Sequence, residues 1–300
     1  MKNKRMLGNV LLLFTAMIWG TAFVFQRVGM DSIEPATFNA ARMALAAVAV
    51  GIVSFLMRGR NRTSGIKAEE NKRFRRDTFI GGICCGCFLA LGSIFQQMGL
   101  VHTTAGKAGF ITAMYMLLVP VISFVFLKKR YHVIVWIAVV MGIVGMYFLC
   151  ISEKFSFDYG DVLVMVCALF FCFHILCCDH FVKRGDPVAI SAIQFAVTAV
   201  ISFIFAIFTE EPGIDKVISA IVPILYCGIV SGGIGYTLQI VAQRFTEPAI
   251  ASLLMSMESV FAVIAGTLIL DERMRVRELV GCIIMFLAII IVQIPEKKKK

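Results

Sequence analysis

Charged residues are scarce in this 300-residue sequence. They make up 16% of the chain, against 59% for hydrophobic residues, whereas a soluble domain has about 25% charged and about 45–50% apolar residues. A soluble protein with so little charge could not keep its surface hydrated. A soluble enzyme, a nucleic-acid-binding protein and a disulfide-stabilised scaffold are therefore not expected.

Motifs that would indicate an ATP-driven pump or a hydrolase are also missing. The sequence contains no Walker A, His-Glu-x-x-His or Gly-x-Ser-x-Gly pattern, which leaves no visible site for ATP hydrolysis or for a hydrolase reaction. The ten cysteines lie inside or at the ends of apolar runs and form no paired Cys-x-x-Cys zinc pattern, so we expect them to behave as small hydrophobic residues. We expect no cofactor and no metal.

Long apolar runs are what the sequence does have. Ten of them are long enough to cross a bilayer, which requires about 20 residues each. Inside lipid, runs of this length can satisfy their backbone polar groups only as helices, so the expected fold class is an all-α membrane protein. The ten predicted spans are 7–29, 35–57, 77–101, 106–127, 131–151, 160–182, 187–208, 216–243, 248–270 and 274–294.

The basic residues predict the orientation of the chain. If the N-terminus is cytoplasmic, 21 of the 29 Lys and Arg residues lie in inside segments and 7 lie in outside segments. Cytoplasmic loops of membrane proteins show this bias, so both termini are predicted to be cytoplasmic. The basic 58–76 loop is interpreted as a topology anchor that contacts anionic lipid.

The two halves of the chain align with each other. An offset of 152 places Trp19 on Phe171, and an offset of 143 places Gln96 on Gln239. Each half contains five predicted spans, so the second half must cross the membrane in the opposite sense. Inverted repeats are typical of secondary transporters, which bind their solute near the midplane between the repeats. We predict two five-helix repeats, residues 1–153 and 154–296, followed by a basic cytoplasmic tail, residues 297–300.

Three motifs give the chain a resemblance to a known family. Trp-Gly-Thr at 19–21, the segment 108–115 with Pro120, and Asp-Glu-Arg at 271–273 are similar to motifs of the EamA family of the drug/metabolite transporter superfamily. The resemblance covers nearly the whole chain, as two five-helix EamA-like units of the ten-helix exporter type. It implies an inner-membrane carrier, often an exporter of amino acids or other small metabolites, with a cavity lined by the first, third, fourth, sixth, eighth and ninth helices.

Polar and aromatic residues at matched depths mark the candidate site. An ionisable group inside a bilayer is costly and indicates function, and Glu258, in the middle of the ninth span, has Tyr115 as its repeat partner. Glu258 could carry a proton, bind a substrate ammonium group, or serve as a structural carboxyl between two helices. For His174 the alternatives are a proton site and a histidine hydrogen-bonded to a neighbouring helix. The residues predicted to bind substrate are Trp19, Gln26, Gln96, Tyr115, Phe171, His174, Tyr236, Gln239 and Glu258.

Other polar residues have a structural or a weak functional interpretation. Asn39 and Arg42 lie one turn apart near the outer end of the second span and are interpreted as structural, with the arginine snorkelling or pairing. His174 and Asp179 match a minimal acyltransferase pattern. A five-residue step on an α-helix, however, leaves two side chains about 140° apart.

The function that these patterns predict is secondary transport of a small metabolite, such as an amino acid, outward by alternating access. Coupling to protons through Glu258 or His174 is a second prediction. Two alternatives stay open, a multidrug exporter with a loose apolar cavity and a membrane-embedded enzyme that uses the pair His174 and Asp179. The expected partners are a small-molecule substrate, the lipid bilayer and protons, without nucleic acid, and no oligomeric state follows from the sequence.

Overall fold

The computed structural model describes residues 2–58, 68–103, 105–150, 158–269 and 276–293. Within these ranges the chain is helical and contains no strand, which confirms the prediction of an all-α protein. In chain order the helices are α1 (Lys2–Gly29), α2 (Pro35–Arg58), α3 (Ala68–His102), α4 (Ala105–Ala113), α5 (Tyr115–Val125), α6 (Val133–Cys150), α7 (Tyr159–Phe181), α8 (Pro187–Thr209), α9 (Ile214–Ser219), α10 (Ile221–Leu225), η1 (Tyr226–Tyr236), α11 (Thr237–Gln243), α12 (Pro248–Met255), α13 (Glu258–Ile269) and α14 (Val276–Gln293).

The length and apolar character of these helices suit a bilayer. Eight helical stretches of the described chain are long and apolar enough to cross a membrane, and two shorter apolar helices cover Val133–Phe148 and Leu279–Val292. Large side chains such as Phe55, Phe126 and Phe208 are exposed. An apolar surface of this kind is unfavourable in water and matches the interior of a bilayer. The structure is that of an integral membrane protein.

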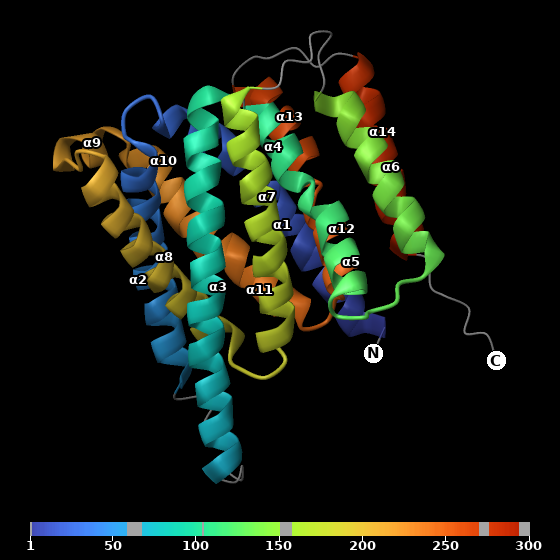
Figure 1. Cartoon of the computed structure of the whole chain (residues 1–300), viewed down its shortest axis with the longest axis horizontal. Coiled ribbons are helices and arrows are strands. Elements are labelled where there is room, and N and C mark those ends of the chain that lie inside the picture. The colour runs from blue at the N-terminus through green and yellow to red at the C-terminus, as the bar shows by residue number, and fades with distance from the viewer. Residues whose placement is uncertain (1, 59–67, 104, 151–157, 270–275, 294–300) are drawn as a thin grey trace.

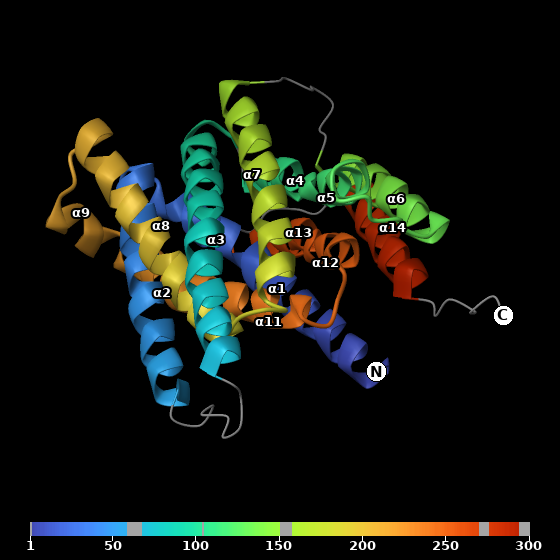
Figure 2. The same cartoon turned by 60° about the horizontal axis from the view of Figure 1, so that its bottom comes forward.

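The helices form a bundle with a pair of helices at each side. Helix α2 packs against α8 at one side, and α6 packs against α14 at the other (Figures 1 and 2). Between these pairs, α3 packs against α7, and α1 packs against α13, η1 and α11. Gly20 allows α1 to approach α13 closely, because a Cβ atom at this position would lie 2.6 Å from the carbonyl oxygen of Glu258.

Carboxylates cap two helices that begin at prolines. Asp186 accepts a hydrogen bond from the amide of Val188 at 2.9 Å, at the start of α8. Glu210, at the end of α8, accepts from the amides of Ala36 and Thr37 at 2.8 Å each, at the start of α2. Proline suits the first position of a helix, and a carboxylate satisfies the free N–H groups there. These caps fix where α2 and α8 begin.

Two of the predicted spans contain an internal tight turn. The fourth is divided at Met114 and the ninth at Ser256 and Met257. The amide of Leu117 donates to the carbonyl of Met114 at 3.0 Å, and the amide of Ser259 donates to that of Ser256 at 3.2 Å. Hydrogen bonds over three residues tighten the helix locally. The predicted spans 106–127 and 248–270 correspond to the membrane-length stretches Lys107–Val125 and Pro248–Ile269, but hydropathy does not register the turn inside each of them.

The predicted eighth span is irregular as well. Residues 216–219 belong to α9, and the membrane-length stretch begins at Ile221. The prediction of a start at residue 216 is wrong, because the helix is interrupted at Ala220 between α9 and α10. Helix η1 is a π-helix in which four of the eleven residues are glycine. Glycine weakens the preference for a regular α-helix.

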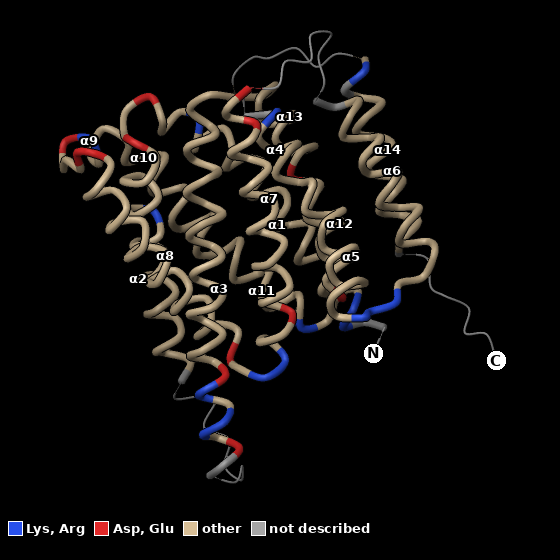
Figure 3. The backbone as a smooth tube through the Cα atoms, in the orientation of Figure 1, with Lys and Arg blue, Asp and Glu red and all other residues tan. Residues whose placement is uncertain are grey.

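Charged residues gather at the two ends of the helices (Figure 3). At the end where α2 begins, Lys216 forms an ion pair with Glu34. Partial burial raises the pKa of Glu34, but the hydrogen bond and the charge of Lys216 outweigh this and hold the pKa below its ordinary value. Lys107 and Asp161 form a second ion pair, with 2.6 Å between Nζ and Oδ2 and with the Asp161 side chain fully buried. These pairs join segments that are distant in the sequence.

Some sequence features lie outside the described residues. They are the motif at 271–273, the tail at 297–300 and residues 59–67 of the basic segment. The described part of that segment begins α3, where residues 70–76 are exposed. This end of α3 extends beyond the neighbouring helices (Figure 1).

Candidate functional site

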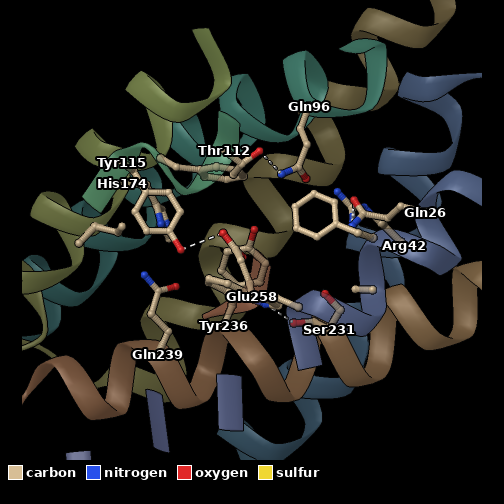
Figure 4. A pocket seen from close by; sticks show the side chains of 15 residues that line it. Gln26, Arg42, Gln96, Thr112, Tyr115, His174, Ser231, Tyr236, Gln239 and Glu258 are labelled. Carbon is tan, nitrogen blue, oxygen red and sulfur yellow. Dashed lines mark hydrogen bonds between the residues drawn. The ribbon is translucent and has the colours of Figure 1, made fainter. Parts of the chain in front are cut away.

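A cavity lies inside the bundle, between helices from both halves of the chain (Figure 4). Its walls come from α1, α2, α3, α4, α5, α7, η1, α11 and α13. The lining residues are Trp19, Ala22, Phe23, Gln26, Arg42, Gln96, Thr112, Tyr115, Phe171, His174, Ile175, Ser231, Tyr236, Gln239 and Glu258. The cavity therefore combines aromatic rings, amides, one carboxyl and one guanidinium.

All nine residues that the sequence predicts to bind substrate line this one cavity. The structure thus brings the whole predicted set together, while their role in binding stays a prediction. Three polar lining residues, Arg42, Thr112 and Ser231, are absent from that set. Thr112 could have been found, because it precedes Tyr115 by three residues and so shares its helix face.

Tyr115 and Glu258 meet directly. Tyr115 Oη donates a hydrogen bond to Glu258 Oε1 at 2.9 Å (Figure 4), and both side chains are buried. Tyr115 begins α5 and Glu258 begins α13, so each residue follows one of the tight turns. The bond joins the two divided spans at the positions that the offset of 143 relates.

Aromatic rings form one wall of the cavity. The ring centres of Trp19 and Tyr236 are 4.5 Å apart, and the His174 ring meets Tyr236 edge-on at 5.8 Å. Trp19 Nε1 donates to the carbonyl of Ser231 at 3.3 Å, which ties α1 to η1. Rings in such contacts offer an apolar surface with a defined geometry. The wall suits the apolar part of a solute.

Two amide side chains of the cavity, Gln96 and Gln239, differ in how far their hydrogen-bonding groups have partners. Gln96 Nε2 donates to Thr112 Oγ1, and Gln239 Nε2 donates to Gln243 Oε1, each at 3.3 Å. Gln239 Oε1 is buried and has no hydrogen-bond partner among the described residues. A buried acceptor without a partner is costly and rare in proteins. Gln239 is therefore suited to accept a hydrogen bond from a solute.

Arg42 differs from its sequence interpretation. The expectation of a snorkelling side chain is wrong, because Arg42 is 3% exposed and lines the cavity. Its Nη1 donates to Gln26 Oε1 and its Nε to Asn39 Oδ1, both at 2.9 Å. The pairing that the sequence left open is thus made with neutral amides. The sequence does not show which way the side chain turns within α2.

His174 and Asp179 are held by different partners. His174 Nε2 lies 3.0 Å from Gln194 Oε1. The two oxygens of Asp179 accept from Lys129 at 2.8 Å and from Lys183 at 2.6 Å. The pair that a membrane-embedded enzyme would use is therefore not assembled. The described residues also contain no group of three His, Cys, Asp or Glu side chains placed to share a metal ion.

The cavity is narrow in this conformation. It offers a volume of about 30 Å³ to the centres of water molecules, and one water needs about 10–15 Å³ on that measure. Only a few water molecules fit without movement of the walls. A larger solute can enter only if lining side chains or helices shift.

The fold and the cavity together define a polytopic helical membrane protein with an internal polar site. The sequence model of the EamA-like transporter family matches residues 6–151 and again residues 158–294. The chain belongs to the EamA-like transporter family. This confirms the resemblance found in its motifs, and it makes the protein a membrane transporter.

Individual relatives agree with this assignment. An uncharacterized transporter of Archaeoglobus fulgidus is 30% identical over 97% of this chain and 87% of its own. The uncharacterized transporter YoaV of Bacillus subtilis is 23% identical over 94% of each chain. A protein crystal structure matches 95% of this chain and 96% of its own with a TM-score of 0.73 and 17% identity. The last similarity concerns the fold alone.

Proposed function

We propose that the protein is a secondary transporter that moves a small polar or amphipathic metabolite, such as an amino acid, outward by alternating access. The observation that carries the proposal is the convergence of matched residues from both halves of the chain on one buried cavity. A solute in that cavity would be held between two similar structural units. Such an arrangement can change its open side when the units rock against each other.

Helix directions and contacts support an inverted repeat of ten spans. Helices α1 and α7, which the offset of 152 relates, run in opposite directions (Figure 1). Thr103 Oγ1 donates to Asp161 Oδ1 at 3.1 Å, and Thr246 Oγ1 donates to Asn9 Oδ1 at 3.1 Å. The two offsets relate these bonds, since Thr103 corresponds to Thr246 and Asn9 to Asp161. We infer repeats at 1–153 and 154–296, with α6 and α14 as the fifth and tenth spans.

The orientation follows from the distribution of basic residues. The end of the bundle that holds the start of α1 also holds the exposed basic start of α3 (Figure 3). Because cytoplasmic segments are rich in Lys and Arg, we infer that the protein lies in the cell (inner) membrane with both termini on the cytoplasmic side. Single cysteines at Lys72 and Tyr159, in a chain without its native cysteines, test this. We expect labelling from opposite compartments, and labelling from the same one would overturn the inverted arrangement.

The lining chemistry supports a small amphipathic solute. Glu258 can accept an ammonium group, Gln239 Oε1 can accept a further hydrogen bond, and Trp19 offers an aromatic face. An amino acid with an apolar side chain carries groups that match all three. Glu258 and His174 are also the lining residues that could carry a proton. We infer that solute transport is coupled to proton movement through Glu258 or His174.

Flux measurements in proteoliposomes test the proposal. The purified protein is reconstituted, and flux of a panel of labelled amino acids and other small metabolites is followed with and without a pH gradient. We expect saturable flux of at least one metabolite, a loss of that flux in Trp19→Ala, and normal flux in Glu211→Gln. Glu211 is an exposed carboxyl just after α8 and serves as the matched control for Glu258→Gln.

The outcomes separate the alternatives. Absence of saturable flux for the whole panel would contradict metabolite transport, and weakly selective flux of cationic dyes would instead indicate a multidrug exporter, which the aromatic wall also suits. Flux that persists in Glu258→Gln and His174→Ala and ignores the pH gradient would remove proton coupling. Facilitated diffusion would then remain.

A further inference from the structure

Arg42 is held rigidly by two layers of neutral side chains. In the first layer, Asn39 and Gln26 each accept one hydrogen bond from its guanidinium at 2.9 Å. In the second, Asn39 Nδ2 donates to Ser93 Oγ and to Ser202 Oγ at 2.8 Å each. These partners come from α1, α2, α3 and α8. Four helices therefore fix the position of one buried cation.

This cation has no counter-ion among the described residues. No carboxylate oxygen lies within ion-pairing distance of Arg42; the nearby Cys227 offers only a thiol, which is a weak partner. A buried charge without an opposite charge is costly. The amides use two of its five N–H groups and the thiol of Cys227 takes a further contact, so neutral partners use only part of its donor capacity. A negatively charged group in the cavity would therefore stabilise the buried guanidinium.

Within the cavity, Arg42 lies opposite the carboxyl group of Glu258 (Figure 4). Arg42 and Gln26 lie toward one side of the cavity, and Tyr115 and Glu258 lie across it (Figure 4). The Phe38 ring covers the guanidinium at 5.6 Å from its centre. A planar guanidinium that is fixed in this way has N–H donors in one plane, an arrangement that matches the two oxygens of a carboxylate.

We propose that Arg42 is the binding site for a carboxylate group of the transported solute. Gln26 and Asn39 act as positioning residues that hold the guanidinium for this contact. The inference rests on the proposed transport function and deepens it, because it requires a negatively charged group on the solute. It assigns to α2 a direct part in recognition, in addition to its packing against α8.

Binding to matched carboxylates and amides tests the inference. The probes are 3-phenylpropionate with 3-phenylpropionamide, and L-phenylalanine with L-phenylalaninamide, which differ only at the carboxylate. Binding to the purified full-length protein is measured as thermal stabilisation, since a ligand of the folded state raises its apparent stability. We expect the wild-type protein to bind at least one carboxylate about tenfold or more tightly than its amide, as charge-assisted bonds are worth that much.

Three variants make the result specific to Arg42. Arg42→Gln should lose the preference for carboxylate. Gln26→Glu should lose it as well, because it places a built-in carboxylate at 2.9 Å from Nη1, and it should fold at least as stably as the wild type because it neutralises the buried charge. Arg27→Gln removes a neighbouring exposed arginine and should keep the preference.

Each outcome decides the inference. It is overturned if neither carboxylate is preferred in the wild type, or if the preference survives in Arg42→Gln or Gln26→Glu. Loss of the preference in Arg27→Gln would also contradict it, since this would indicate a general charge effect. Carboxylate binding at Arg42 without flux in proteoliposomes would sustain the inference and contradict the proposed transport.

Discussion

Replacement of Gly20 by alanine tests the close contact between α1 and α13. A Cβ atom at Gly20 would lie 2.5 Å from Phe261 Cβ, 2.6 Å from the carbonyl oxygen of Glu258 and 2.7 Å from the amide of Ala262. Two of these three atoms belong to the backbone, so no side-chain rotation relieves the clash. Carbon atoms in good contact are about 3.5–4.0 Å apart, so the two helices would have to separate by about 1 Å.

The expected cost follows from this displacement. Overpacking of a tight interior destabilises a protein by about 1–3 kcal/mol. Gly51 on α2 provides the matched control, because a Cβ atom there would meet nothing within 4 Å. Alanine at this position should be neutral or should stabilise the helix by up to about 1 kcal/mol. The two variants should therefore differ by about 1–4 kcal/mol in their free energy of unfolding.

Unfolding of the purified variants in mixed detergent micelles measures this difference. Tryptophan fluorescence can follow the transition because Trp19 lies one residue before Gly20. If Gly20→Ala unfolds at the same denaturant concentration as Gly51→Ala, α1 and α13 do not approach as closely as described. The position of Glu258 in the cavity would then need another explanation.

Three further predictions concern the polar contacts. A double-mutant cycle of Tyr115→Phe and Glu258→Gln should give a coupling energy of about 0.6–1.7 kcal/mol in unfolding experiments, and purely additive effects would contradict their bond. Asp161→Asn should destabilise the protein by about 1–3 kcal/mol, whereas Arg27→Gln, in an exposed pair, should change it by less than about 0.5 kcal/mol. The pKa of Glu34 is held below its ordinary value of 4.5, so its contribution is present above that pH and is lost as the pH falls through the folded pKa. Glu34→Gln should thus show a smaller loss of thermal stability below about pH 4.5 than the wild type, and identical pH profiles would refute this.

Residues that line the cavity could be picked out from the sequence because the cost of polar groups in a membrane is a local property. Glu258 and Gln239 stand out in apolar runs wherever the helices finally pack. The internal alignment then related them to Tyr115 and Gln96, and all four line the cavity. Hydropathy and repetition were sufficient for this part of the prediction.

The irregular parts of the helices could not be predicted in the same way. The turns at Met114 and Met257 and the π-helix η1 depend on contacts between distant segments. A Cβ atom at Gly228 of η1, for example, would lie 2.8 Å from the carbonyl oxygen of Arg42. The direction of the Arg42 side chain likewise involves Gln26 of α1, which meets it only when the two helices pack. These features arise from tertiary packing, which a periodic pattern does not contain.

The π-helix makes the number of residues in one span as important as their identity. Ser231 and Tyr236 both line the cavity, although five residues on an α-helix would place them about 140° apart. If this segment were a regular α-helix of the same length, one of these two side chains would turn away from the cavity. Deletion of one residue at Gly232 or Gly233 would favour a regular α-helix and would leave Ser231 and Tyr236 four positions apart, about 40° from each other. Both side chains would then still face the cavity, so a single-codon deletion here should preserve the lining, whereas the same deletion in a regular α-helix would rotate it.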